Sequence, residues 1–166
     1  MAADFSPGTD RLLDRAGVIC AERGARLTDL RRDVLGLILE ADAPAGAYDL
    51  LERLRARRPG AAPPTVYRAL DFLLEHGLIH RVERLSAFIG CVVPAPDAHA
   101  HAHAAQFLIC RVCGRVTEIE DPALVQALTR ASAGVGFRVQ TATIEAEGLC
   151  AVCAGTHSAS TATRIT

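Results

Sequence analysis

Four cysteines of the chain occur as two pairs with the same spacing, and a glycine follows each pair within two residues. Two intervening residues let both thiolates of a pair face one metal ion, and four thiolates complete the closed tetrahedral shell of a structural zinc site. Unrelated redox pairs or buried apolar cysteines are the alternative, but neither explains the matched spacing. The sequence therefore predicts one structural zinc ion bound by Cys110, Cys113, Cys150 and Cys153.

A catalytic role is not expected for these residues. Catalytic zinc needs three protein ligands and an open fourth position, which a shell of four thiolates does not leave. The H-E-x-x-H motif of zinc proteases and the H-x-E signature of zinc deaminases are absent from the sequence. We therefore predict that the protein is not an enzyme.

A second metal site is predicted from two short β-prone runs that flank Leu85-Ser86. If the hairpin turn is centred on these two residues, His80 lies directly opposite Cys91, and side chains opposed in this way have Cβ atoms roughly 4.5–5.5 Å apart. One zinc ion could then bind both side chains. Taken singly, His80 is typical of strand surface and Cys91 of a core, so it is their pairing that favours a metal site.

The other two ligands of such a site must come from elsewhere in the chain. His103 and Glu118 are the candidate donors. His99, His101 and His103 alternate with alanine, which is also consistent with a loose zinc-binding tract. A zinc-buffering or interaction protein is therefore a rival reading, although it leaves residues 65–68 without a role.

The first half of the chain is predicted to be mostly helical. Apolar residues recur at helical spacing over residues 10–23, from Thr28 onwards, over residues 48–57, and from Pro63 to a stop at Gly77. The β-prone runs at 78–83 and 87–93 follow. Helices that end in such a hairpin make a winged helix-turn-helix domain, which we assign to residues 1–93.

The second half of the chain has a different pattern. Residues 94–105 are predicted to form a hinge, and strands are predicted over 106–109, 115–118 and 138–147, with a helix over 121–133. The fold class is therefore α+β, with the winged helix-turn-helix domain followed by a small α/β domain at 106–155 that contains the four-cysteine zinc site. Residues 156–166 are expected to be a disordered tail.

Charge and hydropathy limit the other options. The net charge is −1, and residues 1–92 contain 13 Arg and 13 Asp or Glu, so global basicity does not indicate DNA binding. No run approaches the roughly 18 apolar residues that a membrane span needs. The first residues lack the basic and apolar regions of a signal peptide. We therefore expect a cytoplasmic protein with no membrane partner.

The helix that begins at Pro63 has the arrangement of a recognition helix. Thr65 and Arg68 are three residues apart, on the face opposite to the apolar stripe, and Tyr67 flanks that face. The N-terminal residues of a recognition helix face the major groove, where an arginine can form two hydrogen bonds with guanine. Tyr48, at the start of the preceding helix, could contact a base methyl group or a phosphate; alternatively, it is a half-buried packing residue.

Several segments of the chain resemble the ferric-uptake-regulator (Fur) family. The segments that carry the resemblance are 26–32 (RLTDLRR), 47–51 (AYDLL), 63–77 (PPTVYRALDFLLEHG), 107–114 (FLICRVCG) and 144–150 (IEAEGLC). The most similar branch is that of the zinc uptake regulators, and the likeness covers roughly residues 16–155. The resemblance implies a homodimeric, metal-dependent repressor of operator DNA, in which the α/β domain is the dimerisation domain.

The resemblance also implies a sensing site for zinc, held by two histidines, one cysteine and one glutamate, and hence two zinc ions per chain. By spacing, these ligands fall on His80, Cys91, His103 and Glu118. Iron-sensing relatives lack the cysteine ligand, and thiolate with imidazole suits zinc better than a harder metal.

Many members of the family have a third metal site, which uses a histidine of the dimerisation domain. Residues 119–149 contain no histidine, and whether His99 and His101 replace it is left open. The resemblance supports Tyr48 and Arg68 as DNA contacts. The predicted function is a zinc-responsive transcriptional repressor that controls zinc-uptake genes; the alternative is a regulator of the same family that senses iron, manganese, nickel or peroxide.

Overall fold

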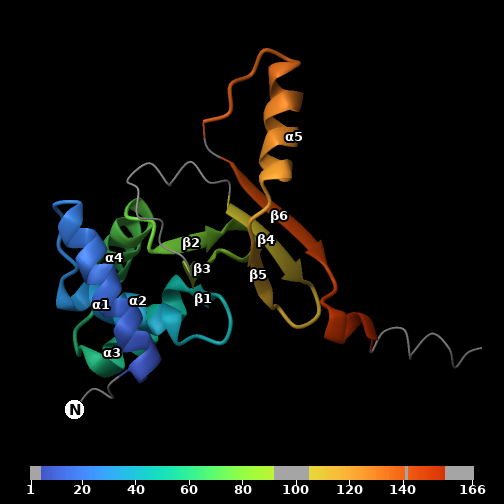
Figure 1. Ribbon diagram of the computed structural model, residues 1–166. Coiled ribbons are helices and arrows are strands. Elements are labelled where there is room, and N and C mark those ends of the chain that lie inside the picture. Colours follow the sequence, from blue (N-terminus) through green and yellow to red (C-terminus); the bar gives the residue numbers. More distant parts are fainter. Residues whose placement is uncertain (1–4, 92–104, 141, 156–166) are drawn as a thin grey trace, which may run out of the picture. The chain divides into compact units, whose positions relative to one another are not determined.

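The computed structural model describes residues 5–91, 105–140 and 142–155, and the chain divides into two compact units, residues 1–100 and 101–166 (Figure 1). In the first unit, helices are followed by a hairpin, which confirms the predicted winged-helix arrangement. Its described elements are α1 (Pro7–Glu22), α2 (Asp29–Leu39), β1 (Ala45–Gly46), α3 (Ala47–Arg57), α4 (Pro63–Glu75), β2 (Ile79–Val82), the 3-10 turn η1 (Glu83–Leu85) and β3 (Ala87–Gly90). The strands form an antiparallel sheet in the order β1-β3-β2.

Local signals set the ends of these helices. Ser6 caps α1, because the backbone N–H of Thr9 donates to Ser6 Oγ at 3.2 Å. Two prolines open α4, where the first-turn N–H groups have no partner within the helix. Gly24 and Gly77, which follow α1 and α4, have φ of 68° and 64°, a left-handed conformation that favours glycine. The predicted helices are therefore confirmed, although α1 begins at Pro7 rather than Asp10.

The apolar stripes of the four helices meet in one core. Leu13, Leu50, Leu54 and Leu73 have no exposed surface, and burying a leucine side chain contributes about 1.5–3 kcal/mol. Cys20 is equally buried, and its burial raises the pKa of the thiol. Cys20 therefore belongs to the core.

A tight turn joins α3 to α4. The backbone N–H of Ala61 donates to the carbonyl of Arg58 at 3.1 Å, and Gly60 between them has φ of 94°. Proline at the second position and a left-handed glycine at the third are typical of a type II turn. Arg55 Nε also donates to the carbonyl of Ala61 at 3.1 Å, so the chain is fixed at both ends of the turn before α4 begins.

The second unit is a mixed sheet with the helix α5 and a short helical segment at 151–155. Its elements are β4 (Ala105–Cys110), β5 (Val116–Ile119), α5 (Pro122–Ala133) and β6 (Thr143–Gly148), with the strand order β5-β4-β6. β4 pairs antiparallel with β5 and parallel with β6. The prediction of a strand over 138–147 is wrong at its start, because residues 138–140 belong to no strand. A parallel pair needs a long crossover, and these residues are part of it.

Gln106 fixes the start of α5. Its side chain is 2% exposed, donates to the carbonyl of Asp121 at 3.0 Å and accepts from the backbone N–H of Asp121 at 3.1 Å. Asp121 in turn caps α5, since its Oδ1 accepts from the N–H of Ala123 at 2.8 Å. Both polar atoms of the buried amide thus have a hydrogen-bond partner, and the amide ties the helix to β4.

Candidate functional site

The sheet of the second unit brings the four predicted zinc ligands together. β4 and β6 run parallel with Cys110 opposite Gly148, so the two cysteine pairs leave neighbouring strands at the same end. The four Sγ atoms all lie within 4.8 Å of one another. The six cysteines all lie in the described residues, and none of them forms a disulfide.

Backbone turns hold each pair in place. The N–H of Gly114, which has φ of 71°, donates to the carbonyl of Cys110 at 2.9 Å. After β6, residues 151–155 are helical, and the N–H of Ala154 donates to the carbonyl of Cys150 at 2.8 Å. The N–H of Arg111 donates to the carbonyl of Gly148 at 3.0 Å, which links the two cysteine-bearing segments directly.

The electrostatics of this cluster favour a bound cation. Backbone N–H groups of Cys113, Cys150 and Val112 lower the pKa of the Cys110 thiol to about 5, and the Cys150 N–H lies 3.4 Å from its sulfur. A hydrogen bond with Cys150, together with burial, raises the pKa of Cys153 to about 12. Four adjacent sulfurs therefore cannot all ionise unless a cation is present.

The sulfur geometry fits zinc. Cys113 Sγ and Cys150 Sγ are 3.8 Å apart, which is about the separation of two ligands around a tetrahedral ion with Zn–S bonds of roughly 2.3 Å. Thiolates are soft donors, which zinc accepts readily. The residues present thus satisfy the donor type, number and spacing of a structural zinc site.

The register predicted for the β2–β3 hairpin is wrong by two residues. His80 lies opposite Ile89, and Cys91 donates its backbone N–H to the carbonyl of Leu78 at 3.0 Å. The connection is a four-residue loop, made of η1 and Ser86 with φ of 48°, rather than a two-residue turn. Two more residues in the loop shift every cross-strand pair by two.

His80 and Cys91 nevertheless come together. Side chains alternate between the two faces of a strand, so a shift of two residues keeps them on the same face. Diagonal neighbours on one face have Cβ atoms about 7–8 Å apart, within reach of longer side chains. The ligand atoms of His80 and Cys91 lie within 4.8 Å of each other. The structure thus brings this pair together through a contact other than the predicted one.

The other two predicted ligands of the sensing site lie outside the first unit's sheet. Glu118 is half-buried on β5 of the second unit, opposite Phe107. His103 lies outside the described residues, as do His99 and His101.

The predicted DNA-contact residues lie on the surface of the first unit. Tyr67 is 46% exposed, Arg68 is exposed and Thr65 is half-buried, whereas Val66 of the same turn is buried. Tyr48, at the start of α3, is 73% exposed. The alternative that Tyr48 is a half-buried packing residue is therefore wrong.

Leu78 has a role that the sequence does not reveal. Its N–H donates to the carbonyl of Leu73 at 2.9 Å, which closes the end of α4, and its carbonyl accepts from Cys91. Its side chain is 2% exposed. Leu78 follows Gly77 and looks like an ordinary core residue in the sequence, so only the hairpin register identifies it.

The first unit is a winged-helix unit whose wing, the β2–β3 hairpin with Cys91 at its end, carries the pair His80 and Cys91. The second unit is an α/β unit with a four-cysteine cluster. Together they define a metal-binding member of the winged-helix proteins. The sequence profile of the Ferric uptake regulator family matches residues 22–147. The chain belongs to this family.

Individual relatives are similar over most of their length. The Zinc uptake regulation protein of Escherichia coli (strain K12) is 43% identical over 145 residues, which cover 87% of this chain and 82% of that protein. A solved zinc uptake regulator complexed with zinc and DNA has a TM-score of 0.84 at 40% identity, covering 92% of this chain and 99% of that chain. The crystal structure of holo XcZur has a TM-score of 0.79 at 41% identity, and the match covers 88% of this chain and 99% of that chain.

None of the described helices is both long enough and apolar enough to cross a bilayer.

Proposed function

We propose that this protein is a zinc-responsive transcriptional repressor that binds operator DNA as a homodimer when its sensing site holds zinc, and that it controls zinc-uptake genes. The observation that carries this proposal is the 43% identity to a zinc uptake regulation protein across most of both chains. The similarity to a zinc uptake regulator complexed with zinc and DNA supports it. A cytoplasmic location agrees with this function.

Two zinc ions per chain serve different purposes in this proposal. The four-cysteine site is the permanent one, because its shell is closed. The sensing ligands are His80, Cys91, His103 and Glu118. With two neutral imidazoles, one thiolate and one carboxylate, the charge of this donor set balances that of a divalent ion.

In this proposal the sensing ligands come from the wing, the hinge and the second unit, so a bound ion would connect these three segments. Without the ion, a thiolate and a carboxylate brought together would repel each other. Two recognition helices of a homodimer must lie about 34 Å apart to enter successive major grooves. Zinc would therefore favour one arrangement of the dimer, the one that fits DNA.

Contacts with DNA are assigned to Tyr48, Thr65, Tyr67 and Arg68. Their support is the exposure of both tyrosines and of Arg68 on α3 and α4. Arg68 is the base-reading candidate, because a bidentate contact to guanine contributes about 1–3 kcal/mol of discrimination.

A gel shift with operator DNA across buffered free zinc tests the proposal. We expect retention only as zinc rises, a loss of about 1–3 kcal/mol of operator preference in Arg68→Ala, and a higher zinc requirement in Cys91→Ala. Arg11→Ala, an exposed arginine of α1, is the matched control. Operator binding by Cys91→Ala with unchanged zinc dependence would contradict the sensing site.

The metal identity is tested separately. A family member that senses iron, manganese, nickel or peroxide is the alternative, and the thiolate of Cys91 favours zinc over a harder metal such as manganese. Metal content after purification, and the metal that restores DNA binding to the stripped protein, distinguish the two.

A further inference from the structure

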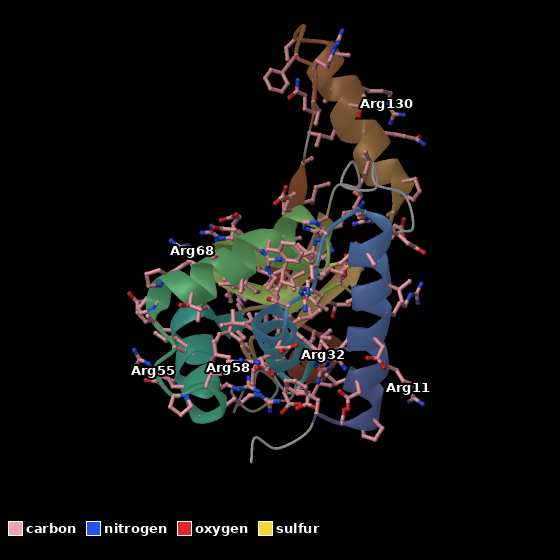
Figure 2. The ribbon with its side chains drawn as sticks, turned by 90° about the vertical axis from the view of Figure 1, so that its left-hand side faces the viewer. Arg11, Arg32, Arg55, Arg58, Arg68 and Arg130 are labelled. Atoms are coloured by element: carbon pink, nitrogen blue, oxygen red, sulfur yellow. The ribbon has the colours of Figure 1, made fainter. Side chains whose placement is uncertain are left out.

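Positive charge is concentrated around the α3–α4 turn. Residues 53–70 contain five arginines and no aspartate or glutamate, although residues 1–92 as a whole are balanced. Figure 2 shows Arg55 and Arg58 at the same end of α3, on the side of the view where α4 carries Arg68, whereas Arg11 lies on α1 at the other side. The surplus charge therefore lies next to the candidate recognition helix.

One carboxylate from α2 pairs with two of these arginines. Asp33 Oδ1 accepts from Arg57 Nε at 3.4 Å, and Asp33 Oδ2 accepts from Arg58 Nε. The guanidinium of Arg57 also lies 4.1 Å from the ring centroid of Phe5. The exposed fractions of the side chains are 15% for Asp33, 17% for Arg57 and 40% for Arg58. Arg57 is therefore enclosed, whereas Arg58 reaches the surface and is oriented by Asp33.

Arg58 is also the C-cap of α3 and the first residue of the turn that leads into α4. A recognition helix enters the groove by its N-terminal end, so the turn before it approaches the phosphates that line the groove. Arginine binds phosphate in a bidentate manner. Without Asp33, the guanidinium of Arg58 would be available to such a phosphate.

We propose that Asp33 limits the sequence-independent affinity for DNA by pairing with Arg57 and Arg58 beside the recognition helix and offsetting one of their two charges; this inference rests on the proposed function. Contacts to phosphates strengthen binding to every DNA sequence and carry no sequence information directly. By holding Arg58 in an ion pair, Asp33 removes one sequence-independent contact and leaves the base-reading residues untouched. Binding to DNA outside the operator is weaker as a result.

The location of the pair makes it suitable for this role. Asp33 and Arg57 are mostly buried, and salt screens such a pair less than an exposed one. Arg32 offers a contrast within the same unit: it pairs with Asp10 at 3.3 Å and Asp14 at 2.8 Å, whose side chains are 44% and 73% exposed. Both of these partners lie on α1, away from the α3–α4 turn. Asp14 is therefore a matched control for Asp33.

The test measures the affinity of the full-length, zinc-loaded protein for a random-sequence duplex and for the operator across a range of salt concentrations. For Asp33→Asn we expect several-fold tighter binding to the random duplex. The slope of log K against log salt should become steeper by about 0.9, the value for one added phosphate contact. The operator should gain by about the same factor, because a phosphate contact does not depend on the base sequence. Asp14→Asn and Asp33→Glu should keep the slope of the unmodified protein.

A second substitution assigns the effect to Arg58. In the Asp33→Asn background, Arg58→Gln should return the slope to its original value, whereas Arg58→Gln alone should change it little. If Asp33→Asn instead weakens binding to both duplexes in proportion, with no change of slope, Asp33 only stabilises the fold and the inference is overturned. The random duplex requires no operator, so these slopes remain decisive even if zinc-dependent operator binding, and with it the proposed function, fails.

Discussion

The two units of the chain bury their residues to very different extents. The first unit has a single apolar cluster to which all four of its described α-helices contribute. In the described part of the second unit, the buried residues are Gln106, Phe107, Ile109, Cys110 and Cys153, and α5 has no buried residue. Leu124 and Leu128 of α5 are 39% and 37% exposed.

The contrast indicates where each unit obtains its stability. An apolar core of the size seen in the first unit can maintain a fold without help. A small unit with few buried side chains usually needs a metal, a disulfide or a partner subunit. The second unit has a four-thiolate cluster and an uncovered apolar helix face, so zinc and a second copy of the chain are the expected supports. Four experiments test this contrast.

Zinc removal should have the largest effect, and it should be confined to the second unit. Structural zinc contributes about 10–16 kcal/mol in zinc-finger peptides, far more than any single side chain here. A strong chelator, or Cys113→Ser, should therefore abolish hydrogen-exchange protection in β4 and β6 while α2 and α4 stay protected. Cys91→Ser, which spares the four-cysteine cluster, is the control. Unchanged protection of β4 after chelation would show that the second unit does not depend on the metal.

Truncation of a buried leucine should affect the stability of the first unit, whereas truncation of an exposed leucine on α5 should affect self-association. Leu73→Ala removes a side chain with no exposed surface and should destabilise the first unit by about 2–5 kcal/mol in urea unfolding. Leu128→Ala on α5 should leave that transition unchanged and should weaken self-association, as measured by sedimentation. A loss of first-unit stability in Leu128→Ala would contradict the separation of the two cores.

The burial of Cys20 in the core of the first unit should make the stability of that unit depend on pH. Cys20→Ser places a hydroxyl in an apolar site and should cost about 1–3 kcal/mol, with zinc content unchanged. Because burial raises the pKa of the Cys20 thiol above its ordinary value of 9.0, the folded state keeps a proton that the unfolded chain loses. This contribution is complete below pH 9 and is lost as pH rises above it. The stability of the native chain should therefore fall more steeply above pH 9 than that of Cys20→Ser; parallel curves would refute the assignment.

The smallest effect is expected at the wing. Ser86 has φ of 48°, which costs a non-glycine residue free energy that glycine avoids. Ser86→Gly should therefore stabilise the first unit by up to about 1 kcal/mol, offset in part by the greater freedom of glycine in the unfolded chain. The urea midpoint measures the change, and Ser6→Gly, which alters a helix cap instead, should lower it.

The sequence was sufficient to predict the structure where a local signal specifies it. Proline at the start of α4, Gly77 at its end and the matched cysteine spacing each have one dominant interpretation, and each is confirmed by the structure. The parallel pairing of β4 with β6 places the two cysteine pairs at one end of the sheet, but spacing alone was enough to predict that they meet.

The sequence was insufficient to predict the structure where loop length and tertiary pairing determine the strand register and the strand ends. The loop at 83–86 contains no glycine, asparagine or proline, so nothing in it distinguishes a two-residue turn from a four-residue loop. The two-residue strand β1 exists only because it pairs with β3. Valine, threonine and isoleucine make residues 138–147 β-prone, yet the crossover to β6 uses residues 138–140 as a connection.

The pairing of Leu78 offers a spectroscopic reporter. Its N–H donates to the carbonyl of Leu73 and its own carbonyl accepts from the N–H of Cys91, so the Cys91 amide proton is protected from exchange while the wing stays paired with the end of α4. A single exchange rate, measured at Cys91, would thus record how firmly the wing and the recognition helix are joined, without DNA being present.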